Sequence, residues 1–541
     1  MFMSKFFAYS FLSLFTLVMP LTATAGFGDE KLILSSDGVE NDFFGHSVSV
    51  SGDTAIVGAP QDTGPGSAYV YVRNPATNSW TEQQELLASD GADGDHFGYS
   101  VSISGDTVIV GAYGNDDGGT SRGSAYIFVR SAGNWTEQQK LLNSNGQVND
   151  WFGLSVSISG DTVIVSAEGE DDDGSQSGAA FVYVRNGTTW TEQQKLLPAE
   201  NRANSFFGNS VAIDGDTVVI GKYLDSSTTY QAGSAYVFVR NPNTGVWTEQ
   251  QRLEASDALT SNGAHFGGSV AISNDTIIIG APLDYPDFDA VIGSAYVFLR
   301  SGILWTEQKK LRASDLILGE VFGQSVSISN DTAVVGGIGY LSSNNYNGAA
   351  HIFTRISDTW SEQYIAASDG EINDQFGYSV SVSGDNIVVG ARSDDNNGTE
   401  SGSAYAYSPV AFAPNIVVTD SVEPITDHAI NFGNITVLTL ADQTVTVTNK
   451  GIADLTIGDI ATANALTAPF TIEVDNCSAQ VLTPAANCDL TVRFSPPTTG
   501  DFSDSFDIPS DDLDEATVTI NLSGTAIPIS DVIFSSSFED N

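Results

Sequence analysis

Short runs of alternating apolar and polar residues recur along most of the chain. Residues 47–50 read Ser-Val-Ser-Val, and this period of two predicts a β-strand with one buried face. Residues 51–54 follow as a tight turn in which Gly52 can adopt a positive φ, so they predict a two-residue hairpin. The apolar run at 55–57 predicts a short, buried second strand that pairs with the first.

Two further strands complete this unit. Residues 68–72 read Ala-Tyr-Val-Tyr-Val and predict the third strand. The fourth strand runs from about Trp80 to Leu86, and because these two residues are six positions apart we expect them on the same face. Four short antiparallel strands in one unit are typical of a β-propeller blade.

The unit occurs seven times with a nearly fixed period. Its Phe-Gly pairs are separated by 53, 55, 55, 59, 56 and 54 residues. Such a period indicates a repeat architecture in which each unit buries its apolar face on its neighbours. The anchor phenylalanines are Phe44, Phe97, Phe152, Phe207, Phe266, Phe322 and Phe376.

The seventh copy lacks its fourth strand. The Trp-Thr/Ser-Glu sequence that opens this strand occurs six times, from Trp80 to Trp360, and copy seven stops after 405–407. The missing segment is found near the start of the chain, where 31–37 matches the end of a fourth strand at 140–144. We expect residues 31–37 to pair beside the third strand of the last blade, because closing the ring removes an exposed strand edge.

The repeat resembles a known family. Phe-Gly at 44–45 is followed by Gly-Ala-Pro at 58–60, and the same motifs return at 266–267 and 280–282. They are similar to the FG-GAP repeat of the integrin α-subunit propeller and of many bacterial surface proteins. The resemblance implies an all-β fold, and seven copies imply a seven-bladed β-propeller spanning residues 26–410.

The C-terminal part has a different pattern. Residues 408–415 indicate a linker, and no further copy of the repeat follows it. Alternating strands at 445–449, 490–494 and 518–522 are separated by turn residues, which predicts a β-sandwich over 411–527 with a loose tail at 528–541.

Four motifs of this part resemble the choice-of-anchor D domain, an immunoglobulin-like module of the ASPM/SPD-2/Hydin (ASH) type. They lie at 432–433, 448–451, 492–496 and 522–525.

The N-terminal segment indicates export, which in turn bears on the cysteines. Residues 1–25 carry an early lysine, a largely apolar stretch and Ala-Thr-Ala at 23–25, as a secretory signal peptide does. The two cysteines, Cys477 and Cys488, both lie in the C-terminal part, and an isolated pair in an exported protein is expected to form one disulfide. We therefore expect a secreted or cell-surface protein without membrane insertion, and we expect it to be a monomer.

The chain is strongly acidic, with a formal net charge of −47. This charge disfavours nucleic acid as a partner and favours cations. The alternative interpretation is simple solubility in a salty exterior.

Most of the acids fall in two sets of loops. Because the strands are antiparallel, the loops between consecutive blades and those between the second and third strands lie on one face of the ring. Carboxylates on Gly-rich loops are typical of Ca²⁺ coordination, whereas turns on a solvated acidic surface give the same composition. The loop that binds metal in integrin-type repeats is replaced by a tight turn at 51–54, so that site is not expected. The candidate Ca²⁺ ligands are Asp90, Asp93, Asp95, Asp116, Asp117, Asp171, Asp172, Asp173, Asp369, Asp374, Asp394 and Asp395.

Two other residue types recur near the motifs. An arginine follows the third strand in six blades, and we expect these arginines to pair with acids or backbone carbonyls at the adjacent turn. His46, His96 and His265 lie beside Phe-Gly pairs, where other blades carry different residues, so we interpret them as tolerated loop residues.

The sequence favours a recognition or adhesion protein that presents a propeller face to an extracellular protein or glycan. No nucleophile motif, zinc signature or phosphate loop is apparent, so no catalytic residue or organic cofactor is expected, and Ca²⁺ is the one cofactor considered. Two alternatives remain: an enzyme acting on polysaccharide in the propeller funnel, and a structural matrix protein.

Overall fold

The computed structural model of the chain describes residues 27–529 apart from 63, 76, 118, 201, 259–262, 285–291, 315–319, 340–346, 357, 410–415, 423–427, 450–453, 461–463, 484–485 and 513–515. The signal segment expected at 1–25 and residues 530–541 of the expected tail lie outside the described residues. The described chain divides into two compact units, Phe27–Pro409 and the residues that follow it.

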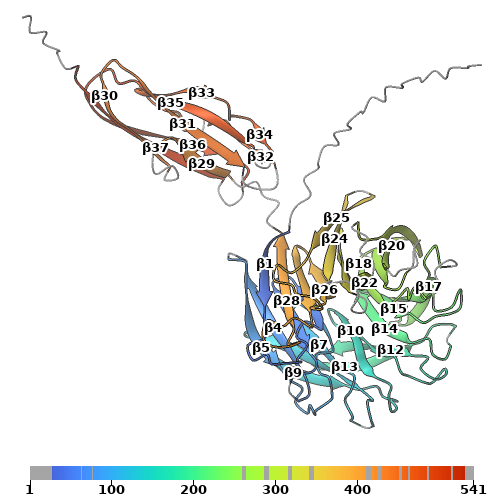
Figure 1. Cartoon of the computed structure of the whole chain (residues 1–541). Coiled ribbons are helices and arrows are strands. Elements are labelled where there is room, and N and C mark those ends of the chain that lie inside the picture. The colour runs from blue at the N-terminus through green and yellow to red at the C-terminus, as the bar shows by residue number, and fades with distance from the viewer. Residues whose placement is uncertain are drawn as a thin grey trace, which may run out of the picture. The chain divides into compact units, whose positions relative to one another are not determined.

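Seven four-stranded antiparallel sheets form the first unit and are arranged as the blades of a propeller (Figure 1). This confirms the all-β, seven-bladed propeller that the repeat predicts. Blades one to six each take four consecutive strands: β2 (Ser47–Ser51), β3 (Thr54–Ala59), β4 (Ser67–Asn74) and β5 (Ser79–Leu86); β6 (Ser100–Ser104), β7 (Thr107–Ala112), β8 (Ser124–Ser131) and β9 (Asn134–Leu141); β10 (Phe152–Ser159), β11 (Thr162–Ala167), β12 (Ala179–Asn186) and β13 (Thr189–Leu196); β14 (Phe207–Asp214), β15 (Thr217–Lys222), β16 (Ser234–Arg240) and β17 (Trp247–Leu253); β18 (Ser269–Ser273), β19 (Thr276–Ala281), β20 (Ser294–Ser301) and β21 (Leu304–Leu311); β22 (Glu320–Ser329), β23 (Thr332–Gly339), β24 (Ala349–Ile356) and β25 (Thr359–Ile365).

Blade seven is assembled from both ends of the unit. It contains β26 (Phe376–Ser383), β27 (Asn386–Ala391) and β28 (Ser403–Pro409), and its fourth strand is β1 (Phe27–Ile33). β1 pairs antiparallel with β28, so that Phe27 lies opposite Pro409 and Ile33 lies opposite Ala404. The strand begins four residues before the segment 31–37 that the sequence pattern indicates.

The first strand of every blade contacts the first strands of both neighbours, and these seven strands form a closed inner ring. Their serines join the blades. The Ser47 hydroxyl donates to the carbonyl oxygen of Gly98 in blade two at 2.8 Å. Across the closure, the Ser379 hydroxyl donates to the Gly45 carbonyl oxygen at 2.8 Å, and the Val50 N–H donates to Ser381 Oγ at 3.0 Å. The serines of the alternating pattern therefore form hydrogen bonds between neighbouring blades.

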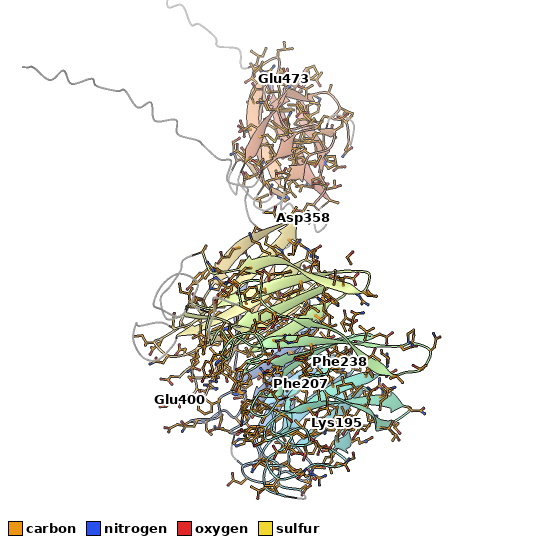
Figure 2. All side chains as sticks on the ribbon, turned by 90° about the vertical axis from the view of Figure 1, so that its right-hand side faces the viewer. Lys195, Phe207, Phe238, Asp358, Glu400 and Glu473 are labelled. Carbon is orange, nitrogen blue, oxygen red and sulfur yellow. A yellow bond between two sulfur atoms is a disulfide. The ribbon has the colours of Figure 1, made fainter. Side chains whose placement is uncertain are left out.

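The Phe-Gly pair has a packing role in each blade. Phe44 is fully buried and meets the ring of Tyr69 edge-on, with centroids 5.5 Å apart. In blade four Phe207 makes the equivalent contact with Tyr236 at 5.6 Å, and it meets the ring of Phe238 edge-on at 6.2 Å (Figure 2). Gly45 has a φ of 88°, and a Cβ added there would lie 2.2 Å from the Ser403 carbonyl oxygen of blade seven. Glycine is therefore required both for the left-handed backbone and for the close approach of the neighbouring blade.

The fourth strand contradicts one expectation from the sequence. Pairing of β4 with β5 shifts by one residue between Val70 and Tyr71, which is a β-bulge. Because of the extra residue, side chains on the two sides of the bulge point to opposite faces from those expected by counting residues. Trp80 consequently packs against the core shared with blade seven, whereas Leu86 lies in the core shared with blade two. The prediction that these two side chains share a face was wrong, because counting residues assumes an unbroken strand.

The bulge explains the repeated Gln-Gln pair. Gln83 and Gln84 both reach Trp135 of blade two: the indole N–H donates to Gln83 Oε1 at 2.8 Å, and the Trp135 backbone N–H donates to Gln84 Oε1 at 2.8 Å. The Gln84 amide in turn donates to the Trp135 carbonyl oxygen at 2.8 Å. The outer strands of these blades are thus joined by side chains.

The repeated arginines join turns and blades. Arg130 Nη2 lies 2.6 Å from Asp106 Oδ1 of the turn between β6 and β7, and its Nη1 donates to Thr54 Oγ1 of blade one at 3.1 Å. The same Arg–Asp pair occurs in four other blades, whereas Arg300 donates to the Gly302 carbonyl oxygen at 3.0 Å.

The second unit has the strands of the expected β-sandwich. One sheet has the order β29 (Ile416–Asp420), β31 (Ala441–Asn449), β35 (Asn487–Phe494) and β33 (Phe470–Asp475). The other has β30 (Ala429–Thr436), β37 (Thr517–Ile527) and β36 (Gly500–Pro509), and a short pair is formed by β32 (Leu455–Thr456) and β34 (Val481–Leu482). One cluster of apolar side chains, including Val445, Leu490 and Ile520, forms its core.

The disulfide expected from the cysteine pair is present in this unit. Cys477 and Cys488 are joined, with their Cα atoms 5.3 Å apart. Cys477 is fully buried and belongs to the same core cluster, so the bond links a loop to the hydrophobic centre of the sandwich.

Candidate binding site at the channel mouth

Three positions per blade lie where the inner ring opens: the residue before Phe-Gly, the residue after it, and the residue after the second strand's Gly-Ala pair. The first strand begins and the second strand ends at the same edge of an antiparallel pair, so these positions surround the ring axis at one end, which we call the channel mouth. The end is the one that carries the acidic loops. Aromatic residues at the mouth are Phe43, His46, His96, Tyr99, Tyr113, Trp151, Phe206, Tyr223, His265 and Tyr378, and all of them keep part of their surface exposed.

The rings of blades seven, one and two form a continuous layer. The ring of His46 lies 4.4 Å from that of Tyr99 and 5.1 Å from that of Tyr378, measured between centroids. Tyr113 is 4.5 Å from Tyr99 and stacks on His96 at 5.1 Å. Ring contacts of this kind hold the side chains in place, and each of these residues keeps part of its surface exposed.

A second aromatic group lies in blades four and five. The ring of Tyr223 is 5.8 Å from that of Phe206 and 5.3 Å from that of His265. Burial lowers the pKa of His265, so this imidazole is neutral near pH 7.

Arg392 is the positive charge of the mouth. Its guanidinium carbon lies 3.8 Å from the centroid of the Tyr378 ring and 5.8 Å from that of Phe43. Arg392 Nε donates to Gln375 Oε1 at 2.8 Å, which fixes the orientation of the side chain. Burial, followed by the charge of Arg392, lowers the pKa of His46 to about 3, and this histidine is therefore neutral.

Glu168 is the carboxyl group of the mouth. It is 8% exposed, and burial raises its pKa to about 8, so it is mostly protonated at pH 7. Burial raises the pKa of Tyr223 to about 12 with a further contribution from Glu168, and Glu168 also adds to the raised pKa of Tyr99. Glu168 of blade three is therefore close enough to Tyr99 of blade two and to Tyr223 of blade four to affect both.

The backbone at the mouth is unusual. Six residues that precede Phe-Gly have a left-handed φ between 55° and 59°, a conformation that bulky side chains rarely adopt. Such residues persist where the surroundings enforce them, and they cluster at functional sites. They are Phe43, His96, Trp151, Phe206, His265 and Gln375.

A model of the FG-GAP repeat matches seven segments that together cover more than half of the chain. They are residues 27–71, 80–128, 135–183, 190–238, 247–298, 305–353 and 360–407. The chain belongs to the FG-GAP repeat family. Each matched segment begins with a fourth strand, and the first includes β1, in agreement with the closure of blade seven by the N-terminal strand. Residues 425–525 match the HYDIN/CFA65/VesB-like Ig-like domain, which confirms the immunoglobulin-like module.

Three solved structures are similar to parts of the chain at low sequence identity. The PapD-like domain 7 of human CEP192 is 16% identical, with a TM-score of 0.18, and the match covers 22% of this chain and 89% of that domain. A proposed 6-phosphogluconolactonase of Bacteroides uniformis is 10% identical over 62% of this chain and 87% of its own, with a TM-score of 0.42. Sqt1 of Saccharomyces cerevisiae is 9% identical over 76% and 94%, with a TM-score of 0.38. No curated protein sequence matches the chain.

The acidic loops of this FG-GAP propeller have identifiable roles in holding its turns. Asp116, Asp171 and Asp395 each accept a hydrogen bond from a backbone N–H five residues later, at 2.6–2.7 Å. Asp95 and Asp374 are buried and accept a backbone N–H three residues earlier. These contacts match the interpretation of carboxylates as turn formers.

Other candidate ligands contact tyrosines or cations. Asp90 accepts a hydrogen bond from the Tyr126 hydroxyl. The Tyr405 hydroxyl lies 2.8 Å from Asp369 Oδ1 and 2.7 Å from Asp394 Oδ2, and it can donate to either one. Asp117 and Asp172 pair with lysines of their blades, and Asp93 and Asp173 are exposed. The candidates form three groups, around blades two, three and seven, and within them Lys140 lies between Asp90 and Asp117 while the Tyr405 hydroxyl lies between Asp369 and Asp394. Calcium binding by these residues stays a prediction.

Sequence reasoning missed the channel mouth. The sequence predicts tolerated loop residues at His46, His96 and His265, whereas the structure places these histidines among the mouth aromatics. A signal was available: residues flanking Phe-Gly differ from blade to blade and are rich in aromatics, while the motif itself repeats.

Proposed function

We propose that this FG-GAP protein is an extracellular recognition protein whose channel mouth binds a glycan. The observation that carries the proposal is the layer of partly exposed rings formed by His46, Tyr99, Tyr113 and Tyr378, with Arg392 stacked on Tyr378. Ligand sites are typically concave, lined by aromatic side chains, and oriented by a few polar groups.

A sugar chain suits this mixture of groups. Sugar rings have apolar faces that stack on aromatic rings, and hydroxyl groups that need donors and acceptors. At the mouth, Arg392 donates only, whereas a protonated Glu168 can donate and accept. Asn209 and Gln324, which follow Phe-Gly in blades four and six, and Gln375, which precedes it in blade seven, add amide groups.

The other parts of the chain support an extracellular role. FG-GAP repeats and Ig-like domains are typical of extracellular proteins. Within the described ranges, no helix is long and apolar enough to cross a membrane. In this proposal residues 1–25 direct export, and the Ig-like domain spaces or attaches the propeller.

Glu168 keeps the enzyme alternative in consideration. A carboxylic acid with a pKa of about 8 is suited to general acid catalysis near neutral pH. Glycoside hydrolysis, however, generally needs a second carboxylate on the other side of the bond. Of the three mouth positions in each blade, Glu168 alone carries a carboxylate, so the mouth favours binding.

The test is a glycan and protein binding screen of the mature chain, repeated with Tyr99→Ala and Arg392→Ala. Each substitution should weaken glycan binding at least about tenfold, because aromatic and arginine anchors dominate binding energy. Tyr230→Ala is the matched control, since Tyr230 is an exposed tyrosine in the loop between β15 and β16.

Glycan affinity unchanged in both mouth variants would contradict the proposal. A protein ligand that requires the same two residues would replace the glycan. Release of reducing ends from polysaccharide that stops in Glu168→Gln would favour the enzyme instead.

A further inference from the structure

In four blades a positively charged side chain of the fourth strand pairs with two carboxylates beside the acidic loops. In blade five Lys310 Nζ lies 2.6 Å from Asp257 Oδ2 and 2.5 Å from Asp284 Oδ2. The Tyr296 hydroxyl donates to Asp257 Oδ1 at 2.8 Å, and the ammonium lies over the Tyr296 ring. The equivalent cations of blades two, three and four are Lys140, Lys195 and Arg252.

Blade one has the same register and the opposite charge. Glu85 lies opposite Tyr69 as Lys310 lies opposite Tyr296. Up to this position the fourth strand reads Trp-Thr-Glu-Gln-Gln in blades one and two, and the next residue is Glu85 in blade one and Lys140 in blade two. A single charge reversal therefore removes the cation from an otherwise repeated arrangement.

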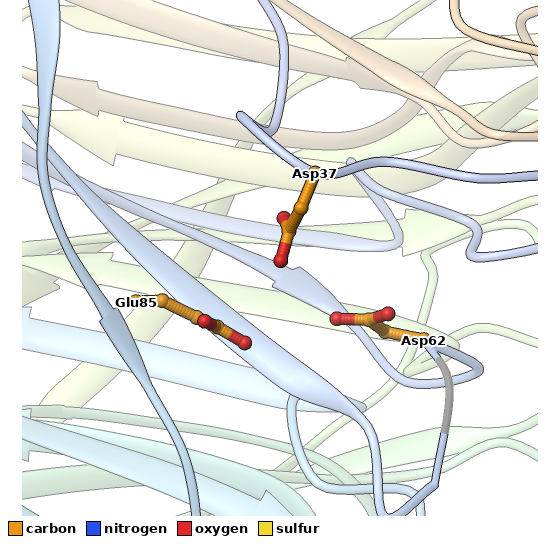
Figure 3. Close-up of side chains that lie close together, drawn as sticks. All are labelled: Asp37, Asp62 and Glu85. Atoms are coloured by element: carbon orange, nitrogen blue, oxygen red, sulfur yellow. The ribbon is translucent and has the colours of Figure 1, made fainter.

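Three carboxylates meet at the vacated position (Figure 3). Asp37, Asp62 and Glu85, which we call the carboxylate triad, each place one oxygen within 4.8 Å of the others. The Tyr69 hydroxyl lies 2.9 Å from Asp37 Oδ1 and 2.8 Å from Asp62 Oδ2, and its single proton can serve only one of them at a time. Ser67 Oγ donates to Glu85 Oε1 at 3.0 Å.

The remaining two blades have no acid at the position of Glu85: it is Tyr364 in blade six, opposite His351, and Leu32 in blade seven, opposite Tyr405. In blade six His351 Nε2 lies 2.9 Å from Glu320 Oε1. In blade seven the Asn396 amide donates to Asp369 Oδ2 at 3.0 Å. Among the described residues, blade one alone combines two loop carboxylates with a third carboxylate from the strand.

We propose that the carboxylate triad binds a Ca²⁺ ion, which takes the place of the lysine ammonium of blade five. The comparison within the ring carries this inference, because the equivalent aspartates already hold a positive charge in blade five. Carboxylate oxygens are the hard ligands that Ca²⁺ prefers, and ligands from three separate segments suit its flexible coordination better than the strict octahedron of Mg²⁺. Glycan recognition at the mouth is not required for it.

The ion would fasten the ring closure. Asp37 follows the closing strand β1, Asp62 lies between β3 and β4, and Glu85 lies on β5. The same segment is held by Ser36, whose N–H and hydroxyl donate to Glu82 at 3.0 and 2.9 Å. A bound Ca²⁺ therefore connects the N-terminal segment to two other parts of blade one and should stabilise the closed ring.

The experiment is calcium titration of the mature chain with a reciprocal pair of variants. Glu85→Lys recreates the blade-five arrangement, so it should lower the number of bound Ca²⁺ ions by one. Lys310→Glu recreates the triad in blade five, so it should raise that number by one. Tb³⁺ luminescence sensitised by Tyr69 gives a second readout at the site.

Thermal unfolding supplies the energetic readout. At a Ca²⁺ concentration ten times the Kd, the folded-to-unfolded ratio rises about elevenfold, which corresponds to a rise in melting temperature on the order of 2 °C. Glu85→Lys should lose this response. An unchanged Ca²⁺ stoichiometry in Glu85→Lys overturns the proposal, as does an equal response of the natural chain to Mg²⁺. Should Glu85→Lys fail to fold, Glu85→Gln is titrated instead, and an unaltered Ca²⁺ affinity there overturns it equally.

Discussion

The propeller and the Ig-like domain distribute their stability in different ways. In the propeller each described core cluster is shared between adjacent blades, as when Trp135 packs with Leu86 of blade one. The Ig-like domain has a single described core cluster, and a disulfide is attached to it. A blade therefore depends on its neighbours and on ring closure, whereas the sandwich depends on its own interior. A deletion or substitution in one unit should therefore lower the stability of that unit and leave the other unchanged.

Removal of the closing strand should have the largest effect. Deleting residues 27–37 exposes the edge of β28 and removes Ile33 from the core, so we expect a loss comparable to the stability of a whole domain, about 5–15 kcal/mol. Calorimetry of the mature chain should show the propeller transition abolished and the Ig-like transition retained. Deletion of 530–541 is the control. Small and equal losses from both deletions would contradict the role of β1.

Loss of the disulfide should affect the other unit. Replacing Cys477 and Cys488 by serine opens a loop with a sequence separation of 11 residues, and we expect the Ig-like domain to lose about 2–3 kcal/mol. The propeller transition should stay at the same temperature. A shift of both transitions in calorimetry would show that the units do not unfold independently.

A pH effect should be smallest and confined to the propeller. Burial lowers the pKa of His351, but hydrogen bonds to Glu320 and Glu362 outweigh it and raise the pKa to about 9. The folded value lies above the ordinary 6.5, so this stabilisation is complete below pH 6.5 and is lost as the pH rises through 9.

Between pH 6.5 and 9 we expect the propeller to lose roughly 1–2 kcal/mol from this source. Denaturant unfolding across this range measures the loss, and His351→Gln should flatten the profile. A profile with the same slope in both proteins would assign the pH dependence to other groups.

The sequence predicted what the blades share and missed what distinguishes them. The hairpin turns, the four strands of each blade and the fourth strand that the N-terminal segment supplies to blade seven all follow from repetition. The bulge at Gln83 could not be predicted, because it is defined by how β5 pairs with β4. The sequence of β5 alone does not show which residue is left unpaired.

The sites were harder to predict for a related reason. The channel mouth is assembled from single residues of different blades. His46 of blade one and Tyr378 of blade seven, for example, have ring centroids 5.1 Å apart only because the ring closes. Glu85 is negatively charged where Lys310 of blade five is positively charged. This difference points to a site only when the structure shows that the two residues occupy the same position in their blades.

Ring closure also determines how the propeller is inserted in the polypeptide. Phe27 lies opposite Pro409, so the chain enters and leaves the propeller on neighbouring strands of one sheet. A module with adjacent entry and exit points can be placed within a surface loop of another protein without stretching its host, and its ends can be joined to give circular permutants. We therefore expect this propeller to be tolerated as an inserted domain, both in evolution and in engineered proteins.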